Sequence, residues 1–561
     1  MEVIAYENCK EVLETLRQKQ SLTLQSLDLL ITELGGQKFA SRTDERLLAV
    51  VYTLQFRTYK QLLPSTAPIP ATLKKELVSV CRACGGRDAS GQPTPAPPPG
   101  TPFSWSRYQV EFARDLDPET ENSPKTLGDL GDRLKGWRTL MESMIEDTHP
   151  SIIKLEEHAP SLAEMSLEEI EMPCQAPHSP DGPETIFIER ISADVEVVRR
   201  ACASSRRITI FGSDGQTRTF LVQPVTQQMA PGHSEERVGQ LLRAANTVMA
   251  THPESRRRGL GFAAPRSRAL MPSGRLIEDD PAATLYVDAY DTYCARYGRE
   301  PDAPILHFKA RTCSEEGGIT DDKEIRRAAY TEIVEKLVTE NVFSQYMYKT
   351  MVENSRVMWT FKRQFALSAA MSAVACYALR LTGRTPNKVL VSKAKGEITH
   401  LELSAMYNDR LQLDMAGETV PFRLTRNMSA FIGPHGFEGT LIAAAVAAAQ
   451  GLQQERTPIV SMLALFLRDD LLAYAQRRLG TRSIASLKLA PHQVELATMS
   501  NVNQCMGRFE KIGPRNSVTG VQQTPNGAQL ANPQMGMREL LAVAMAAGQL
   551  CLMDPTWQPW L

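Results

Sequence analysis

TIFGSDGQTRTF, the stretch Thr209–Phe220, sets the interpretation of the whole chain, because it joins two β-rich runs through a tight turn. The runs Arg207–Gly212 (RITIFG) and Thr217–Val222 (TRTFLV) are rich in β-branched and aromatic residues, which favour strands. Asp-Gly between two such runs is a strong signal for a β-hairpin. Apolar residues at helical spacing lie on either side, so we predict an α+β protein.

Upstream of the hairpin the pattern is helical. Apolar residues recur three and four positions apart over residues 1–85, and again from Trp105 through Leu127–Met144. Asp88–Pro102 (DASGQPTPAPPPGTP) is rich in Pro, Gly, Ser and Thr and predicts a solvated loop without a core. A second cluster of helix breakers, Pro173–Pro183, marks the clearest domain boundary.

Downstream of Glu235 helices dominate again, apart from short β-like pieces near Val389–Val391 and Ile398–Leu403. A third breaker-rich segment, Gly513–Pro533, precedes a predicted apolar helix over Met537–Leu552.

The residues after this helix carry large apolar side chains, namely Trp557, Trp560 and Leu561. Such side chains are costly to leave in water, so we predict that they pack on the preceding helical region as structural anchors. A partner-binding tail is the alternative.

Composition excludes several classes of function. With 63 Lys and Arg against 64 Asp and Glu, the formal charge is −1, so neither a membrane nor direct sequence-specific nucleic-acid contact is expected. Ten scattered cysteines and a charged N-terminal stretch predict a reducing, intracellular compartment. The most apolar run, Leu441–Ala449 (LIAAAVAAA), falls far short of the ~20 residues of a membrane span and predicts a buried helix.

The succession of hairpin, helical region and apolar tail resembles the C-terminal region of the phosphatidylinositol-3-kinase-related kinases. Glu235–Val238 (EERV) resembles the family's Asp-x-Arg-Val/Ile helix start, and Trp359–Phe365 resembles the helix before its catalytic loop. Further stretches resemble a branch of the family whose members are scaffolds of SAGA-type histone acetyltransferase complexes. They are Ser123–Trp137 (SPKTLGDLGDRLKGW), Arg275–Pro281 (RLIEDDP), Val420–Asn427 (VPFRLTRN) and Met553–Leu561 (MDPTWQPWL).

This resemblance implies a bilobal α+β, phosphatidylinositol-3-kinase-like fold, preceded by a helical FAT region and bundle and followed by a FATC helix. The end of the FAT-like helices is expected at residues 1–85, and a helical bundle at 86–172 with its Pro-rich insert at 88–102. The small lobe is expected at 184–290, the large lobe at 291–528, and the FATC-like helix and tail at 529–561.

The small lobe lacks the lysine that a kinase uses to hold the nucleotide phosphates. No lysine occurs between Lys154 and Lys309, an interval that contains the whole expected small lobe. The resemblance places the phosphate lysine at Gln223, whose neutral side chain cannot pair with a phosphate. Arg218 lies nearby, but we expect it to be a solvated strand residue.

The acids of catalysis are also missing, since no aspartate occurs between Lys323 and Asn408. Leu381–Val391 (LTGRTPNKVLV) resembles the family's catalytic loop, which places the base Asp at Gly383, its His at Thr385 and the metal-binding Asn at Lys388. A lysine at that last position opposes metal binding.

His400–Ser404 (HLELS) resembles the family's metal-binding motif, and it places Glu402 where an aspartate is expected. Glu402 could still bind a metal through oxygen, but one carboxylate is poor support for a magnesium–nucleotide site.

These substitutions predict a pseudokinase without catalytic residues, cofactor or metal. The resemblance implies a nuclear scaffold of histone acetyltransferase complexes that links transcription activators to chromatin-modifying subunits, with a further role at damaged DNA. The activators would bind mainly to an upstream region outside this sequence. An active atypical kinase that uses Glu402 for metal and Arg218 for phosphate is the alternative, and an orphan fragment without a function of its own is a third interpretation.

Other motifs favour structural roles. Cys81-x-x-Cys84 is a solitary pair, whereas a structural zinc site needs four ligands. Arg256–Arg258 is a short basic run, either a surface turn or part of a nuclear import signal. Gly259-x-Gly261 lacks the third glycine of a dinucleotide site. His400 is expected to fill a buried or hydrogen-bonded position.

Overall fold

The computed structural model describes residues 43–84, 105–120, 123–164, 170–175, 185–200, 203–224, 234–271, 274–313, 320, 322–350, 355–403, 405–454, 456–479, 491–513 and 533–561. The chain divides into two compact units. The first comprises Met1–Thr58, Pro68–Gln228 and Pro265–Pro281, and the second comprises Tyr59–Ala67, Met229–Ala264 and Ala282–Leu561.

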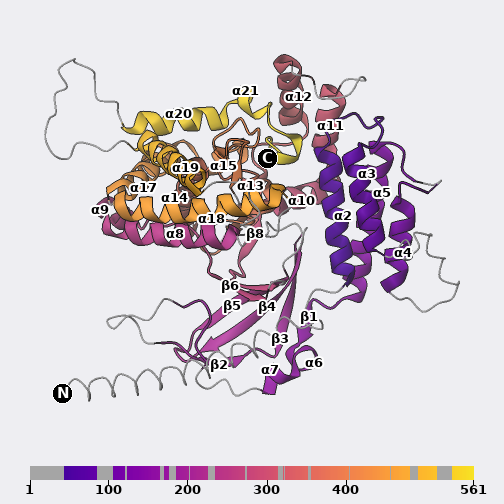
Figure 1. Ribbon diagram of the computed structural model, residues 1–561, viewed down its shortest axis with the longest axis horizontal. Helices are drawn as coiled ribbons and strands as arrows, with labels where there is room; N and C mark the ends of the chain where they lie inside the picture. The colour runs from indigo at the N-terminus through magenta and orange to yellow at the C-terminus, as the bar shows by residue number, and fades with distance from the viewer. Residues whose placement is uncertain are drawn as a thin grey trace. The chain divides into compact units, whose positions relative to one another are not determined.

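The first unit begins, within the described residues, with helices that lie side by side in Figure 1. They are α2 (Thr43–Lys60), α3 (Ala71–Ala83), α4 (Trp105–Leu116) and α5 (Leu127–Thr148). Helix α5 starts where predicted, because the hydroxyl of Thr126 accepts a hydrogen bond from the Asp129 amide at 3.1 Å and caps the first turn. Leu127, Leu130 and Leu134 then form its buried stripe. Residues 1–42 and the Pro-rich insert at 88–102 lie outside the described residues.

An antiparallel sheet forms the rest of the first unit, in the strand order β1-β3-β4-β5-β7-β6, with β2 paired to β4. The predicted hairpin is confirmed as β4 and β5, and Phe211 pairs with Thr217 next to the turn. Gly215 in that turn has φ +70°, a conformation that favours glycine. The sheet covers a core that includes Ile208, Ile210 and Phe220. The strands and the two short helices are β1 (Ile152–Lys154), α6 (Leu155–His158), α7 (Pro160–Glu164), β2 (Ile188–Ile191), β3 (Asp194–Arg200), β4 (Ala203–Gly212), β5 (Thr217–Pro224), β6 (Ser267–Met271) and β7 (Gly274–Glu278).

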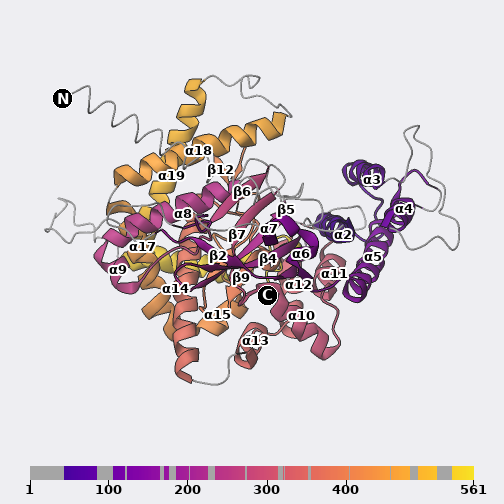
Figure 2. The same ribbon diagram turned by 90° about the horizontal axis from the view of Figure 1, so that it is seen from below.

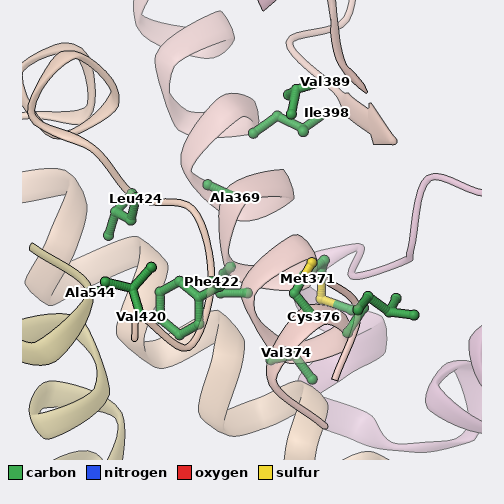
Figure 3. Packing of buried hydrophobic residues seen from close by; sticks show 14 of the residues in the cluster. Ala369, Met371, Val374, Cys376, Val389, Ile398, Val420, Phe422, Leu424 and Ala544 are labelled. Carbon is green, nitrogen blue, oxygen red and sulfur yellow. The ribbon is translucent and has the colours of Figure 1, made fainter. Parts of the chain in front are cut away.

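The second unit is mainly helical and has one large apolar core. Its longer helices lie against one another in Figure 1 and are α8 (Ser234–Thr251), α14 (Ser355–Leu379), α17 (Ile442–Gln454), α18 (Arg456–Leu479), α19 (Pro491–Ile512) and α20 (Pro533–Met545). Figure 3 shows Ala369, Met371 and Val374 of α14 among the buried residues of this core, which also include Phe422 and Ala544. None of the helices in the described part of the chain is both long and apolar enough to cross a membrane.

The apolar run Leu441–Ala449 is buried, as predicted, mostly within α17. Its small residues allow close packing of helices. The Ser255 hydroxyl donates a hydrogen bond to the Ala447 carbonyl at 3.0 Å, and a Cβ on Gly451 would lie 2.9 Å from the same hydroxyl oxygen.

Smaller elements complete the second unit. The predicted β-like pieces are confirmed as β9 (Val389–Ser392) and β10 (Ile398–His400), which form a sheet with β8 (Ala283–Leu285). The remaining elements are α9 (Pro253–Arg258), α10 (Tyr286–Tyr297), α11 (Ala303–Thr312), α12 (Lys323–Lys336), α13 (Val342–Thr350), η1 (Pro386–Lys388), β11 (Met406–Tyr407), β12 (Leu413–Asp414), α15 (Arg426–Ile432), α16 (Pro434–Gly436), the π-helical η2 (Phe437–Leu441), α21 (Ala547–Leu550) and η4 (Pro555–Trp557).

Candidate functional site

The loop between α14 and β9 carries three of the predicted site residues, and Gly383 is the first. Gly383 has φ +69°, a conformation that is strained for any other residue type. Its amide donates a hydrogen bond to Glu418 Oε1 at 2.6 Å. The position where the resemblance expects a catalytic base therefore carries no side chain, and its amide is bound to a carboxylate of the same unit.

Arg384 fastens this loop to the segment that follows β10. The side chain is buried, with 2% of its surface exposed. Its guanidinium donates to the carbonyls of Leu401 at 2.8 Å and Glu402 at 2.9 Å, and to Thr382 at 2.9 Å. A guanidinium that satisfies three backbone oxygens holds the two loops in fixed register.

An ion pair stands at the predicted metal position. Lys388 Nζ lies 2.7 Å from Glu402 Oε2, and both side chains keep between a quarter and a third of their surface exposed. The ammonium takes the place that a divalent cation would need next to this carboxylate, so metal binding would require breaking the pair. No group of three or more metal-ligating side chains occurs within the described ranges.

Glu402 is also held through its backbone. Its φ of +53° is unusual for a residue with a side chain. Its amide donates to Glu235 Oε1 at 2.9 Å, which ties the motif to the first turn of α8. Sequence reasoning quoted Glu235 only as part of a helix start and missed this contact.

Thr385 and its neighbour Asn387 bind each other. The Thr385 hydroxyl donates to Asn387 Oδ1, and the threonine is buried. Asn387 is the only asparagine of this loop. Its amide oxygen, which could ligate a metal, thus accepts a hydrogen bond from Thr385 instead.

Gln223 lies in the first unit, on β5. It is paired across the sheet with Arg275 of β7, and its Oε1 accepts hydrogen bonds from Arg275 Nε at 3.1 Å and Nη2 at 2.9 Å. Arg275 is buried, with 5% of its surface exposed. A positive charge therefore lies beside the predicted phosphate position, but it is directed at the glutamine. The sequence indicated Arg275 only as part of the stretch Arg275–Pro281, so its contact with Gln223 was not predicted.

Arg218, the alternative phosphate ligand, forms an ion pair with Asp214 at 2.6 Å across the hairpin turn. Hydrogen bonding from this guanidinium lowers the pKa of Asp214 to about 2. The arginine thus lies on β5, as predicted for a strand residue, and its guanidinium binds the turn.

Two further charged residues lie beside the catalytic-loop segment, and sequence reasoning missed both. Burial raises the pKa of Glu418, which accepts the Gly383 amide. Arg423, from the stretch Val420–Thr425, is buried, and this burial lowers its pKa to about 9. Its Nε donates to the Arg384 carbonyl at 2.5 Å.

Arg423 also binds the C-terminal tail. Its guanidinium donates to the backbone oxygens of Trp557 and, at 3.2 Å, of Leu561, and its centre lies 3.8 Å from a ring centroid of Trp557. Trp557, Trp560 and Leu561 each expose 3% or less of their surface. The prediction that the tail packs as a structural anchor is confirmed.

His400 occupies a hydrogen-bonded position, as predicted. Its Nε2 lies 2.5 Å from the Ser372 hydroxyl of α14, and its Nδ1 is buried beside a small cavity of about 20 Å³, room for about one water. Burial lowers the pKa of the imidazole to about 3, so the ring is neutral at physiological pH.

The remaining motifs have structural surroundings. Cys81 and Cys84 lie at the end of α3, and burial raises the pKa of Cys84 to about 11. Arg257 and Arg258 pair with Glu254 within α9. Gly259 ends that helix with φ +64°.

The sequence of much of the second unit, including the loop between α14 and β9, is similar to that of known proteins. A model of the family described as phosphatidylinositol 3- and 4-kinase matches residues 231–476. The chain is 28% identical over 462 residues to the human transformation/transcription domain-associated protein, covering 82% of this chain and 12% of that protein. It is 25% identical over 499 residues to the SAGA complex/NuA4 acetyltransferase complex subunit TRA1 of Saccharomyces cerevisiae, covering 84% of this chain and 13% of that protein. The chain thus spans about an eighth of the length of these two relatives.

The structure resembles the solved FAT and kinase domain of CtTel1. The TM-score is 0.53 at 14% sequence identity, and the match covers 92% of this chain and 34% of that one. At this identity the likeness concerns the fold alone. The predicted phosphatidylinositol-3-kinase-like fold, with its helical regions, is confirmed.

Proposed function

For a chain with the phosphatidylinositol-3-kinase-like fold and a sequence similar to transformation/transcription domain-associated proteins, we propose a non-catalytic role. The chain is a pseudokinase scaffold that acts by binding proteins. The relatives named as subunits of SAGA and NuA4 acetyltransferase complexes support a place in such an assembly, in the nucleus, between transcription activators and chromatin-modifying subunits. Phosphoryl transfer is not part of this role.

The ion pair between Lys388 and Glu402 carries the proposal. Kinase catalysis consists almost wholly of positioning and charge stabilisation around metal ions and phosphates. A lysine 2.7 Å from the remaining carboxylate neutralises the charge that would attract magnesium. Gly383 offers no base, and the oxygen of Gln223 accepts hydrogen bonds from Arg275.

Calorimetry with ATP and magnesium on the full chain tests the absence of a nucleotide site. We expect no magnesium-dependent binding at the ten-micromolar scale, which corresponds to about −7 kcal/mol. Lys388→Asn is the informative variant, because it removes the ammonium and supplies an amide oxygen at the metal position. Binding by the unaltered chain at this affinity would contradict the proposal, whereas binding by Lys388→Asn alone would identify the lysine as the block.

An active atypical kinase is the second candidate, and the acidic groups Glu402 and Glu418 beside the loop favour it. Glu418 accepts a hydrogen bond from the Gly383 amide and would take the place of a catalytic base. A radiolabel-transfer assay separates the two candidates. Transfer that is lost in both Glu402→Ala and Glu418→Gln would favour the kinase, and no transfer by the unaltered chain would favour the scaffold.

The proposed assembly is tested by affinity purification of the endogenous protein followed by mass spectrometry. We expect acetyltransferase and chromatin subunits to be recovered with the chain. Their absence, with the protein itself well recovered from nuclei, would contradict the assignment.

A further inference from the structure

The first turns of α14 present an aromatic and basic stripe that the proposed site does not use. Arg356, Trp359 and Arg363 stand at positions i, i+3 and i+7, so they share one face of the helix. Trp359 exposes 65% of its surface, whereas Phe361 and Phe365 on the opposite side are buried. Figure 2 shows this end of α14 at the periphery of its unit. The indole is therefore available to a partner while the helix beneath it is fixed by the core.

The helix that carries the stripe is positively charged. Helix α14 contains three basic residues and no acidic one. The turn between β9 and β10, which carries Lys393 and Lys395 along with the acidic Glu397, packs near Phe361 and Phe365, away from the stripe, since a Cβ on Gly396 would lie 2.9 Å from the Phe361 carbonyl; the positive charge beside Trp359 comes from α14 itself. The whole chain has a formal charge of −1, so this concentration of positive charge is a local feature.

We propose that the stripe of Arg356, Trp359 and Arg363 binds an acidic peptide segment of a partner protein, with a bulky apolar residue of that segment packed on the indole. Trp and Arg are enriched among the residues that carry binding energy in protein interfaces. The two arginines lie on either side of the tryptophan along the helix and can pair with carboxylates that flank the apolar residue. This inference rests on the scaffold role, because it names the chemistry of a partner.

The stripe fits a peptide better than a nucleic acid. Binding of single-stranded nucleic acid commonly combines a basic groove with several aromatic side chains on which successive bases stack. The exposed face of α14 presents one aromatic ring, Trp359. One apolar contact between charged groups matches a short acidic motif.

Fluorescence anisotropy tests the proposal, with the full chain and a labelled synthetic peptide of Asp and Glu that carries a central Phe-Leu pair. We expect Trp359→Ala to weaken binding about tenfold, which corresponds to about 1.4 kcal/mol. Arg363→Glu should weaken binding at least as much, and added salt should weaken binding by the unaltered chain. Val357→Ala is the matched control, because Val357 is 52% exposed on the same helix but two positions from Trp359 and so on another face.

Three results would overturn the proposal. One is equal loss in Trp359→Ala and Val357→Ala, and another is equal binding of a peptide in which Asn and Gln replace the acids. The third is Trp359-dependent binding of an oligonucleotide by a chain that does not bind the acidic peptide. Each of these leaves the nucleotide calorimetry unchanged, so failure here is distinct from failure of the non-catalytic assignment.

Discussion

The catalytic-loop segments at residues 381–403 and the tail at residues 553–561 belong to the same compact unit but retain different properties. In the loops, Gly383 presents no side chain, and the predicted metal position holds a partly exposed ion pair. In the tail the large side chains are buried, and a buried arginine binds the backbone. The two regions therefore differ in how their side chains are held: the tail is fixed by burial, whereas the loops keep an ion pair that solvent reaches.

Arg423 joins the two regions, because it binds the carbonyl of Arg384 on one side and those of the tail on the other. Its neighbour in the loops, Arg384, likewise binds backbone oxygens. Buried arginines therefore hold the backbone of the loops and of the tail in place.

Among the variants that compare the loops with the tail, Arg423→Met should change the free energy of unfolding most. The change leaves the carbonyls of Arg384, Trp557 and Leu561 without this donor, at about 1 kcal/mol or more each. We expect the free energy of unfolding to fall by about 3 kcal/mol in urea titrations. Arg363→Met, an exposed arginine of the same unit, is the control and should change it by less than about 0.5 kcal/mol. Equal effects of the two changes would show that the tail contacts contribute little.

His400 should give an intermediate effect that depends on pH. The pKa of its imidazole is about 3 in the folded chain and near 6.5 when unfolded, so the unfolded state binds the proton more readily. The contribution of the neutral His400 to the free energy of unfolding is therefore fully present well above pH 6.5. It is lost as the pH falls below that value, by about 2 kcal/mol at pH 5.

The variant His400→Gln tests this dependence, since glutamine cannot take up a proton. Unfolding midpoints measured from pH 7.5 to pH 5 should fall less steeply in His400→Gln than in the unaltered chain. His435→Gln, at an exposed position, is the control and should keep the original slope. Identical slopes in all three proteins would contradict a buried neutral imidazole.

Lys388→Met should give the smallest effect. The ion pair with Glu402 is partly exposed, and such pairs contribute about 1 kcal/mol or less. A double-mutant cycle with Glu402→Gln measures their coupling energy, which we expect below about 1 kcal/mol and lower still in high salt. A coupling above about 2 kcal/mol would mean that the pair stabilises the loops as strongly as the tail contacts do.

Local patterns in the sequence predicted the fold well. The Asp-Gly hairpin, the buried alanine-rich helix and the burial of the terminal tryptophans follow from composition within a few residues, and all three are confirmed. Such features depend on turn chemistry and burial, which a short stretch of sequence encodes directly.

The partners of the site residues could not be predicted in this way. Gln223 and Arg275 are 52 residues apart, and Glu418 meets Gly383 across 35 residues. Such contacts depend on how distant segments pack, which periodicity does not report. Lys388 and Glu402 were each identified from the resemblance, but their mutual pairing needed coordinates. That these positions correspond to lost kinase residues stays a prediction.

The bonds to the tail also set an order in time. Arg326 donates to the carbonyls of Leu552 and Met553, and Met553 lies 227 residues later in the chain. At ~5–20 residues per second of synthesis, Arg326 waits roughly 10 to 45 seconds for these acceptors to be made. Arg423 likewise precedes its acceptor, the carbonyl of Trp557, by 134 residues of synthesis. The apolar core of the second unit therefore cannot be completed before residues 553–561 have been translated.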